Sequence, residues 1–295
     1  MLFQITDRKL HQSVISFDDR GELCVPVSQL DTLSFPRLSS PRQVLFMFVS
    51  PGNSSGPMRR ESLDVYLLGL VDFESCVALQ EIILQEISAR NDRHGVLLVC
   101  EHLPLLTIGR EGSHSHVTCD RLELTSRRID TRWINRGGGC LIHAPGQIAF
   151  YPILPLNRIG IGLDQYRGIL EETVLRVAAE LRIAAERAVG TPGVTGRTGQ
   201  FAHIGTAVKS WISYHGMFIN VQPRLDWIRL VQSNPTGLRA SSLEVEKMQR
   251  IEMHAVRESL FRHFASLAGY QQYYPYTGHP LLRRARRKFV HAGNC

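Results

Sequence analysis

The sequence of 295 residues contains no apolar run that approaches the ~20 residues a membrane-spanning helix needs, and residues 45–49 form only a short one. The N-terminus also lacks the order of basic and then apolar residues that is typical of a secretory signal. We therefore expect a cytoplasmic protein that neither crosses nor binds a membrane.

Closely spaced cysteines are also absent. The chain has six cysteines and none forms a C-x-x-C pair, so their spacing predicts neither a zinc site nor a disulfide framework. We expect most of them to be buried thiols that pack as small apolar side chains. These cysteines are Cys24, Cys76, Cys100, Cys119, Cys140 and Cys295.

Net charge is low outside one short segment. The formal charge is +7, and five of these charges lie within residues 283–288. Such a basic cluster can contact nucleic acid or attract an acidic protein. Because no nucleic-acid-binding motif accompanies it, we expect a solvated tail and no nucleic-acid partner. The cluster consists of Arg283, Arg284, Arg286, Arg287 and Lys288.

Composition divides the chain into three parts. Residues 34–62 are rich in serine, proline and glycine, which is typical of a linker or loop. We therefore expect residues 1–62 to form an N-terminal extension that is partly disordered or linker. A main domain over residues 63–270 and a basic tail over residues 271–295 follow.

Apolar periodicity predicts both helices and strands. The chain is 43% apolar, which suffices for a sizeable core, and only 21% charged, which argues against global disorder. Strands and helices interleave in the main domain, so the predicted class is α/β or α+β. We expect a hairpin within 13–27 around 18–21, and helices at 73–90, 163–187 and 252–267. Strands are expected at 65–70, at 95–100 and around a turn within 133–153. Two further strands in 208–221 are expected to join near His215 and Gly216.

The most specific pattern in the sequence is a glycine-rich turn. Arg136 precedes three consecutive glycines, residues 137–139, and His143 and the Pro145-Gly146 step follow. Glycine permits a positive φ and lets a ligand approach the backbone closely. Arginine supplies hydrogen-bond donors, and histidine supplies a donor or a proton acceptor. The pattern therefore predicts a ligand-binding turn.

This stretch resembles the lipoyl(octanoyl) transferases, the octanoyltransferase family of lipoate biosynthesis. The family pattern reads approximately R-G-G-x-x-T-x-H-x-P-G-Q and then Y-P, and the chain departs from it at Leu141, where the family has threonine. The resemblance covers roughly residues 64–268. Further matches in the family order are Glu101-His102-Leu103-Pro104, Thr107-Ile108-Gly109-Arg110, Pro192-Gly193-Val194, Ile204-Gly205, Tyr214-His215-Gly216, Asn220-Val221, Pro235-x-Gly237 and Ser242-Leu243.

The resemblance implies a fold, an activity and partners. The fold is a mixed sheet flanked by helices, like that of biotin and lipoate ligases. The activity transfers octanoyl from acyl carrier protein to a lysine of a lipoyl domain, through an acyl-enzyme on a cysteine. The lipoyl domains are those of 2-oxoacid dehydrogenases or the glycine cleavage protein. No cofactor and no metal is implied.

The resemblance also assigns a set of substrate-binding residues. They fall in three segments, which we expect to meet around one elongated apolar pocket. They are Arg136, Gly137, Gly138, Gly139, Cys140, Leu141, Ile142, His143, His203, Ile204, Gly205, His215, Gly216 and Met217.

Two positions depart from the catalytic pattern of the family. The nucleophilic cysteine belongs to a Pro-Cys-Gly turn, and Thr236 stands in its place. The family lysine lies about four residues before an Ile-Gly step, where this chain has Gln200. A threonine hydroxyl stays protonated at neutral pH and needs a general base, whereas glutamine can neither take a proton nor lower a thiol pKa. We therefore predict impaired or absent transfer.

Other side chains offer alternative chemistry. Cys140 lies in the glycine-rich loop and is a candidate relocated nucleophile with His143 as its base, or else an apolar side chain at a strand end. His203 and His215 are placed near the pocket by analogy. Each is a candidate base, or else makes structural hydrogen bonds.

Two functions remain open from the sequence. One is octanoyl transfer to lipoyl domains with unusual residues, and the other is a non-catalytic protein that binds an acyl chain, acyl carrier protein or a lipoyl domain. A ligase that adenylates lipoate is a third and weaker reading. It requires a lysine near Gln200, and Lys209 lies nine residues later.

Overall fold

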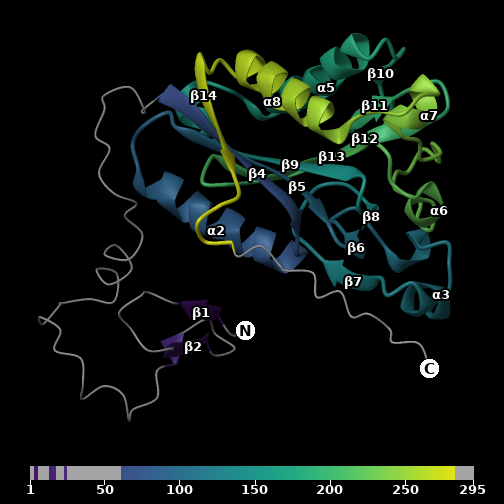
Figure 1. The fold of residues 1–295 in the computed structure, drawn as a ribbon, viewed down its shortest axis with the longest axis horizontal. Coiled ribbons are helices and arrows are strands. Elements are labelled where there is room, and N and C mark those ends of the chain that lie inside the picture. Colours follow the sequence, from purple (N-terminus) through teal and green to yellow (C-terminus); the bar gives the residue numbers. More distant parts are fainter. Residues whose placement is uncertain (1–2, 6–12, 18–22, 25–60, 283–295) are drawn as a thin grey trace, which may run out of the picture. The chain divides into compact units, whose positions relative to one another are not determined.

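The structure, a computed structural model, describes residues 61–282 and three short strands that precede them (Figure 1). Contacts divide the chain into two units, residues 1–56 and residues 57–295. Residues 34–60 of the predicted linker and the basic cluster at 283–288 lie outside the described residues. The candidate site is therefore built from residues 61–282.

The first unit contains a small sheet in the order β1-β2-β3. In the antiparallel pair of β2 and β3, Phe17 lies opposite Leu23. This pairing confirms the hairpin expected within residues 13–27, and its turn lies outside the described part of the chain. The strands are β1 (Phe3–Ile5), β2 (Ser13–Phe17) and β3 (Leu23–Cys24).

The second unit alternates strands and helices along the chain. Its strands are β4 (Ser62–Val71), β5 (Gly95–His102), β6 (Leu105–Ile108), β7 (Asp130–Trp133), β8 (Cys140–His143), β9 (Gln147–Ile153), β10 (Glu186–Arg187), β11 (Gly193–Thr195), β12 (Gln200–Lys209), β13 (Ile212–Asn220) and β14 (Gln272–Thr277). Its helices are α2 (Phe73–Ala89), α3 (Arg121–Ser126), α4 (Leu156–Ile159), α5 (Leu163–Glu180), α6 (Leu225–Ile228), α7 (Leu243–Lys247) and α8 (Met253–Leu267), with a 3-10 turn η3 (His114–His116).

Eight of these strands form one mixed sheet in the order β10-β11-β12-β13-β9-β5-β4-β14. β14, β4 and β5 run parallel to one another. The pairs from β5 across to β10 are antiparallel. A second sheet of three strands has the order β7-β6-β8 (Figure 1). A mixed sheet with flanking helices confirms the predicted fold class.

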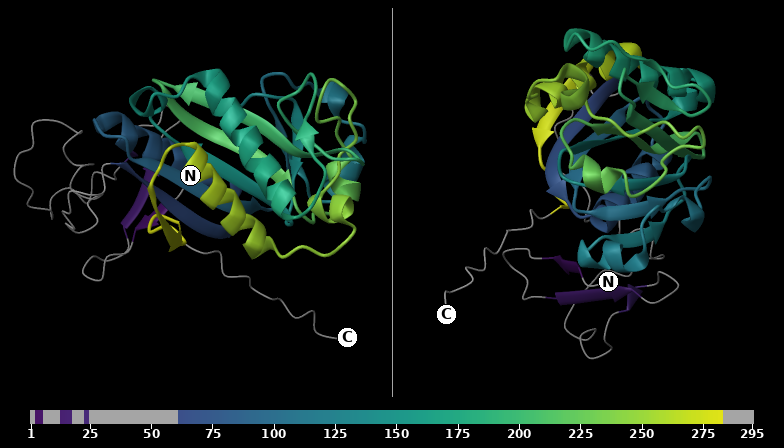
Figure 2. Two further views of the ribbon diagram at one scale, coloured as in Figure 1. Left: turned by 90° about the horizontal axis from the view of Figure 1, so that it is seen from above. Right: turned by 90° about the vertical axis from the view of Figure 1, so that its right-hand side faces the viewer.

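Helices cover both faces of the large sheet. Figures 1 and 2 show α5 and α8 side by side on one face, and Figure 1 shows α2 on the other. Leu97 and Val99 of β5 join the core next to α5 and α8. Val96, Leu98 and Cys100 join the core next to α2. Because both faces are buried, β5 is apolar at consecutive positions rather than at alternate ones.

Local signals set the ends of the helices. α2 begins after Asp72, whose carboxylate accepts hydrogen bonds of 2.9 Å from the N–H and from the hydroxyl of Ser75. α2 and α8 confirm the helices expected at 73–90 and 252–267. α5 ends at Glu180, earlier than expected, because Arg182 adopts a φ of 57°, which a right-handed helix cannot contain.

The hairpin of β12 and β13 corrects one expectation. The sequence suggested a turn near His215 and Gly216, but β13 continues straight through both residues. The turn lies instead at Ser210 and Trp211, which have φ values of 52° and 63°. Gly216 is glycine for a different reason, since a Cβ there would lie 2.1 Å from the carbonyl oxygen of Phe150 on β9.

The end of the chain contributes one more strand. β14 pairs in parallel with β4, with Gln272 opposite Ser62 and Thr277 opposite Leu67. The segment from residue 271, assigned to a basic tail, thus contains an edge strand of the sheet. Within the described residues, no helix combines the length and apolar character needed to cross a membrane.

Candidate functional site

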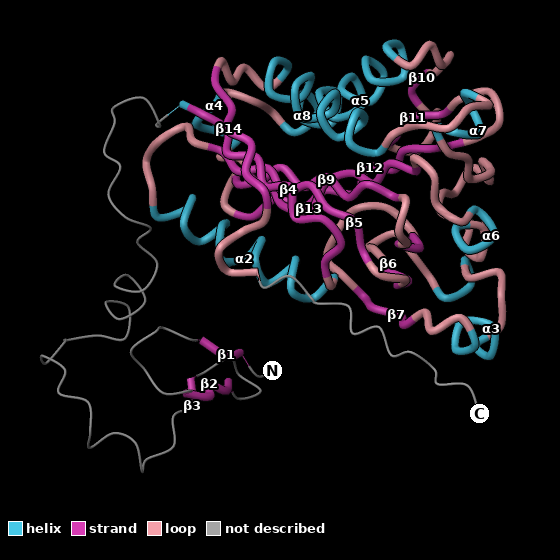
Figure 3. The backbone as a smooth tube through the Cα atoms, viewed as in Figure 1, coloured by secondary structure: helices cyan, strands magenta, loops and turns pink. Residues whose placement is uncertain are grey.

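Thr236, the position that the resemblance assigns to the nucleophile, lies on a long connection between β13 and α7. Figure 3 shows residues 221–242 running mainly as a loop that contains α6. Arg229 closes this loop, because its Nε and Nη2 donate to the carbonyl oxygen of Ala240 at 3.1 and 3.0 Å. Thr236 lies exposed at the turn between them.

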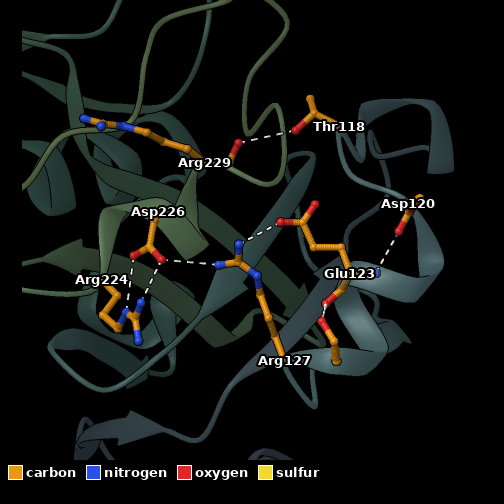
Figure 4. A network of polar contacts seen from close by, with 8 residues as sticks. Thr118, Asp120, Glu123, Arg127, Arg224, Asp226 and Arg229 are labelled. Atoms are coloured by element: carbon orange, nitrogen blue, oxygen red, sulfur yellow. Dashed lines mark hydrogen bonds and ion pairs between the residues drawn. The ribbon is translucent and has the colours of Figure 1, made fainter.

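Polar contacts fix the base of this loop to α3 (Figure 4). Arg127 contacts Glu123 of α3 at 2.7 Å and Asp226 of α6 at 3.3 Å. The hydroxyl of Thr118 donates to the carbonyl oxygen of Arg229 at 3.3 Å. These side chains are partly or largely exposed, so they position the loop more than they stabilise the fold.

Gln200, which the resemblance assigns to the position of the lysine, begins β12 next to this loop. Its backbone N–H donates to the carbonyl oxygen of Arg239 at 2.8 Å, and its carbonyl oxygen accepts from the N–H of Ser241 at 2.8 Å. The side chain is fully buried. The end of the loop is therefore tied to the start of β12.

Asn234 joins these two positions through its side-chain amide. Its Nδ2 donates to Oε1 of Gln200 at 2.9 Å. Its Oδ1 accepts from the hydroxyl of Thr236 at 2.9 Å and from the N–H of Leu238 at 3.0 Å. The side-chain nitrogen of Gln200, Nε2, donates to the carbonyl oxygen of Ala202 at 3.1 Å. The path from Gln200 to Thr236 thus consists of two amides and a hydroxyl.

This path contains no group that titrates near neutral pH. The hydroxyl proton of Thr236 is donated to an amide oxygen, which accepts a hydrogen bond but does not remove a proton. The amide of Gln200 is likewise engaged at both of its ends. The arrangement therefore holds the turn in place through hydrogen bonds between uncharged side chains.

A second path of buried hydrogen bonds begins at Arg136, and along it each side chain donates to the next residue. Its Nη2 donates to Oγ1 of Thr107 at 2.8 Å, and that hydroxyl donates to Nε2 of His143 at 2.8 Å. Nδ1 of His143 donates to Oε1 of Gln147 at 3.0 Å. The amide of Gln147 donates to Oδ1 of Asn220 at 2.9 Å, and the amide of Asn220 donates to the carbonyl oxygen of Ser241.

These directions fix the protonation of His143. Because an amide oxygen only accepts, Nδ1 of His143 carries the proton and Nε2 accepts from Thr107. Burial, together with the charge of Arg136 and the nearby His102, holds the pKa of His143 well below its ordinary value of 6.5. His143 is therefore neutral at pH 7, and both of its ring nitrogens are hydrogen-bonded.

The predicted substrate-binding segments do meet in the structure. The N–H of Gly137 donates to the carbonyl oxygen of Thr206 at 2.9 Å, and Gly205 lies opposite Gly216 in the hairpin. A Cβ on Gly205 would lie only 2.6 Å from the carbonyl oxygen of Gly137. At this point the backbones of the two segments pack directly against one another. The N–H of Gly138 donates to a carboxylate oxygen of Glu111 at 3.1 Å, so this donor of the loop is already occupied.

A hollow of about 290 Å³ borders the turn that carries Thr236, rather than the three predicted segments. Two arginines and several apolar side chains line it. None of the residues that the resemblance assigned to substrate binding is among them. The lining residues are Arg229, Val231, Gln232, Ser233, Gly237, Leu238, Arg239 and Ala240.

The remaining histidines of the candidate site are buried on the β12–β13 hairpin. Burial, with a smaller effect of Arg136, lowers the pKa of His203 to about 4 and that of His215 to about 3. Nε2 of His203 has no hydrogen-bond partner among the described residues. His215 has a φ of 52°, which a histidine adopts more readily than a branched residue.

Cys140 and His143 do not converge. They are three residues apart on β8, so their side chains point to opposite faces of the strand. Cys140 packs in the core of the small sheet and its thiol donates to the carbonyl oxygen of Ser113 at 3.3 Å. His143 stacks instead near Phe73 and Phe218. Burial raises the pKa of Cys140, which lowers its thiolate fraction.

Sequence reasoning missed Asn234. A local signal existed, because asparagine before a Pro-Thr-Gly turn often bonds to the backbone of that turn, as Asn234 does with Leu238. Its bond to Gln200 had no local signal, since 34 residues separate the two. The sequence showed Asn220 only as part of a family match. Its hydrogen bonds to Gln147 and to the carbonyl oxygen of Ser241 become apparent only in the folded chain.

Sequence comparisons agree with this architecture. The family described as "Lipoyl protein ligase A/B catalytic domain" matches residues 72–265. The octanoyltransferase of Geotalea uraniireducens is 34% identical over 198 residues, which are 66% of this chain and 88% of that protein. The octanoyltransferase of Geobacter metallireducens is 36% identical over 203 residues, which are 68% of this chain and 91% of that protein.

Solved structures share the fold at low identity. A lipoate-protein ligase A bound with ATP gives a TM-score of 0.58 at 15% identity, covering 74% of this chain and 90% of that one. The bipartite lipoate protein ligase of Thermoplasma acidophilum gives a TM-score of 0.58 at 15% identity, covering 75% and 89%. From the family match and from these relatives, the chain belongs to the octanoyltransferase family, whose fold is that of the lipoyl protein ligase A/B catalytic domain.

Proposed function

We propose that this protein binds the partners of the octanoyltransferase family, an acyl carrier protein or a lipoyl domain, without transferring octanoyl by the cysteine route of the family. One observation carries the proposal. Thr236 and Gln200, at the family positions of the nucleophile and its lysine, are joined by Asn234 into an uncharged path. Nothing in that path activates a nucleophile.

The chemistry of this path argues against acyl transfer at Thr236. Attack on a thioester requires the hydroxyl to lose its proton, and the acceptor of that proton is the Asn234 amide oxygen. A positioned general base is typically worth about 10²–10⁴ in rate, and the path supplies none. An oxygen ester would also pass its acyl group to an amine less readily than a thioester.

Transfer through Cys140 is the second candidate, because this cysteine follows the glycine-rich loop. Its contacts argue against it. The thiol donates to a backbone carbonyl, burial raises its pKa, and His143 lies on the opposite face of β8. A thiol without a base or a nearby cation in contact with it stays protonated at neutral pH.

Mass spectrometry after incubation with octanoyl-acyl carrier protein tests the proposal. We expect no octanoyl adduct on the wild-type chain and no transfer to an added lipoyl domain. Binding of the carrier protein, measured in parallel by calorimetry, should be detectable and should survive Thr236→Ala. Transfer by the wild type that Cys140→Ala abolishes and Thr236→Ala leaves intact would refute the proposal and identify Cys140 as a relocated nucleophile.

Restoring the family residues gives the complementary test. Thr236→Cys with Gln200→Lys should form an octanoyl adduct on residue 236, and a cation at 200 should raise the rate over Thr236→Cys alone by about tenfold, through the thiolate fraction. The matched control is Thr236→Ala with Gln200→Lys, which keeps the new charge and lacks the nucleophile. An adduct in this control would place the reactive group elsewhere.

A further inference from the structure

Three side chains that can bind a metal ion converge between α2 and the sheet. Cys76 projects from α2, and Cys100 and His102 lie two residues apart on β5, so they share one face of the strand. The Sγ atoms of the two cysteines are 3.9 Å apart, and Nε2 of His102 lies 3.5 Å from Sγ of Cys100. The ligand atoms of all three lie within 4.8 Å of one another.

These separations suit a tetrahedral zinc ion. Zinc binds thiolate at about 2.3 Å and imidazole nitrogen at about 2.0–2.1 Å, so tetrahedral angles place two sulfurs about 3.8 Å apart and sulfur and nitrogen about 3.5 Å apart. The observed values are 3.9 and 3.5 Å. Sγ of Cys76 and Nε2 of His102 lie within 4.8 Å of one another, and they must come to about 3.5 Å for one ion to bind all three side chains.

The ring of His102 already has the orientation of a metal ligand. Its Nδ1 lies 3.0 Å from the carbonyl oxygen of Val71, and because a carbonyl only accepts, Nδ1 carries the proton. Nε2 then carries the lone pair of the ring. It accepts a hydrogen bond from the hydroxyl of Tyr151 at 2.8 Å and lies 3.5 Å from Sγ of Cys100. Metal-bound histidines commonly donate their other ring N–H to a carbonyl in this manner.

Burial and charge favour zinc over harder cations. Cys76 and Cys100 are fully buried in the apolar core next to α2, and His102 is almost so. Two thiolates and one neutral imidazole cancel the charge of a divalent ion, so the complex adds no net charge to this core. Magnesium and calcium prefer oxygen ligands, whereas thiolate and imidazole suit zinc.

We propose that Cys76, Cys100 and His102 bind one zinc ion that fastens α2 to β5. The hydroxyl of Tyr151, which lies 2.8 Å from Nε2 of His102, gives up its hydrogen bond to that nitrogen when the ion binds. On binding, each thiol releases its proton to solvent and the sulfur donates its electron pair to the ion. Because the site is buried, the ion enters while the chain folds. The site does not depend on the function proposed above, since it uses neither Thr236 nor Gln200.

The spacing of the cysteines gave no sign of this site, because its ligands come from two distant segments. Cys100 follows Cys76 by 24 positions in the sequence, and the packing of α2 next to β5 brings the two thiols together. The Cys-x-His step on β5 is a ligand pair only because both side chains share a strand face that α2 covers.

Metal analysis of the full chain tests the proposal directly. The chain is expressed with added zinc and purified with a phosphine reductant, and zinc is counted by plasma mass spectrometry. We expect one zinc per chain, and zinc affinity lowered about 100-fold or more in Cys100→Ala. The matched controls are Cys119→Ala and Cys24→Ser with Cys295→Ser, which should retain one zinc.

Cobalt substitution gives a readout that does not depend on the folding of a variant. The wild-type chain refolded with Co²⁺ should show thiolate charge-transfer absorption and the intense d–d bands of a tetrahedral ion. Absence of both from the refolded reduced chain overturns the proposal, as does zinc content that Cys76→Ala and Cys100→Ala leave unchanged. A Cys76–Cys100 disulfide in a metal-free chain purified without reductant also overturns it.

Discussion

Mild acid should destabilise this protein through two buried histidines. Burial holds the pKa of His203 at about 4 and that of His215 at about 3, and both return to about 6.5 in the unfolded chain. Between these values the unfolded chain binds a proton on each ring and the folded chain does not. Stability is therefore complete well above pH 6.5 and falls as the pH drops toward 4.

The size of the effect follows from the same shifts. Lowering the pH from 7 to 5 should remove about 2 kcal/mol of the free energy of unfolding for each ring, or about 4 kcal/mol for the two. This is a large part of the roughly 5–15 kcal/mol that holds a typical domain folded. Arg136 faces both rings and opposes their protonation further.

Urea unfolding of the full chain at pH 7, 6 and 5, followed by tryptophan fluorescence, measures this dependence. His203→Gln with His215→Asn should reduce the slope by about the 4 kcal/mol assigned to these two rings, whereas buried His102 and His143, whose pKa values are also lowered, keep their share. Asparagine is chosen because residue 215 has a φ of 52°. The control is His254→Gln, which changes an exposed histidine of α8. The reasoning fails if the wild type is equally stable at pH 7 and pH 5, or if the double variant keeps the full slope.

Two further changes test packing and the Asn234 bridge. Asn234→Ala removes four hydrogen bonds at a buried position and leaves Oε1 of Gln200 without its donor, so it should lower the free energy of unfolding by about 2–4 kcal/mol in urea titrations. A loss below about 1 kcal/mol would mean that water replaces the amide. Gly216→Ala should cost about 2 kcal/mol or more in the same assay, because its Cβ would meet a backbone oxygen of β9. Gly168→Ala in α5, where a Cβ meets nothing within 4 Å, should instead stabilise by about 0.5–1 kcal/mol. Equal effects of the two glycine substitutions would contradict this account.

Much of the fold was predictable because the signals for it are local. The apolar spacing at 73–90 and 252–267 predicted α2 and α8, since one helical face packs on the sheet. The end of α5 was predicted too late, because the left-handed backbone of Arg182 leaves no mark on hydropathy. The turn of the β12–β13 hairpin was misplaced for a similar reason, since Trp211 is not a typical turn residue and no glycine or proline stands beside it.

The candidate site was predictable in part. The resemblance assigned Gln200 and Thr236 to the two catalytic positions of the family, and in the structure both side chains hydrogen-bond to Asn234. Gln200 and Asn234 are 34 residues apart in the sequence, so their hydrogen bond forms only when the loop that carries Asn234 folds back onto the start of β12. The relation of Cys140 to His143 was open from the sequence and is decided by the alternation of side chains along β8.

The close approach of Gly137, Gly205 and Gly216 to neighbouring backbone has a consequence for how such chains are recognised. A Cβ at Gly205 or Gly216 would lie within 2.6 Å of a backbone oxygen, and a Cβ at Gly137 would lie 3.3 Å from one, whether or not any reaction takes place nearby. Packing therefore restricts these three positions independently of catalysis. A match to the glycine pattern reports this packing, and octanoyl transfer has to be measured separately.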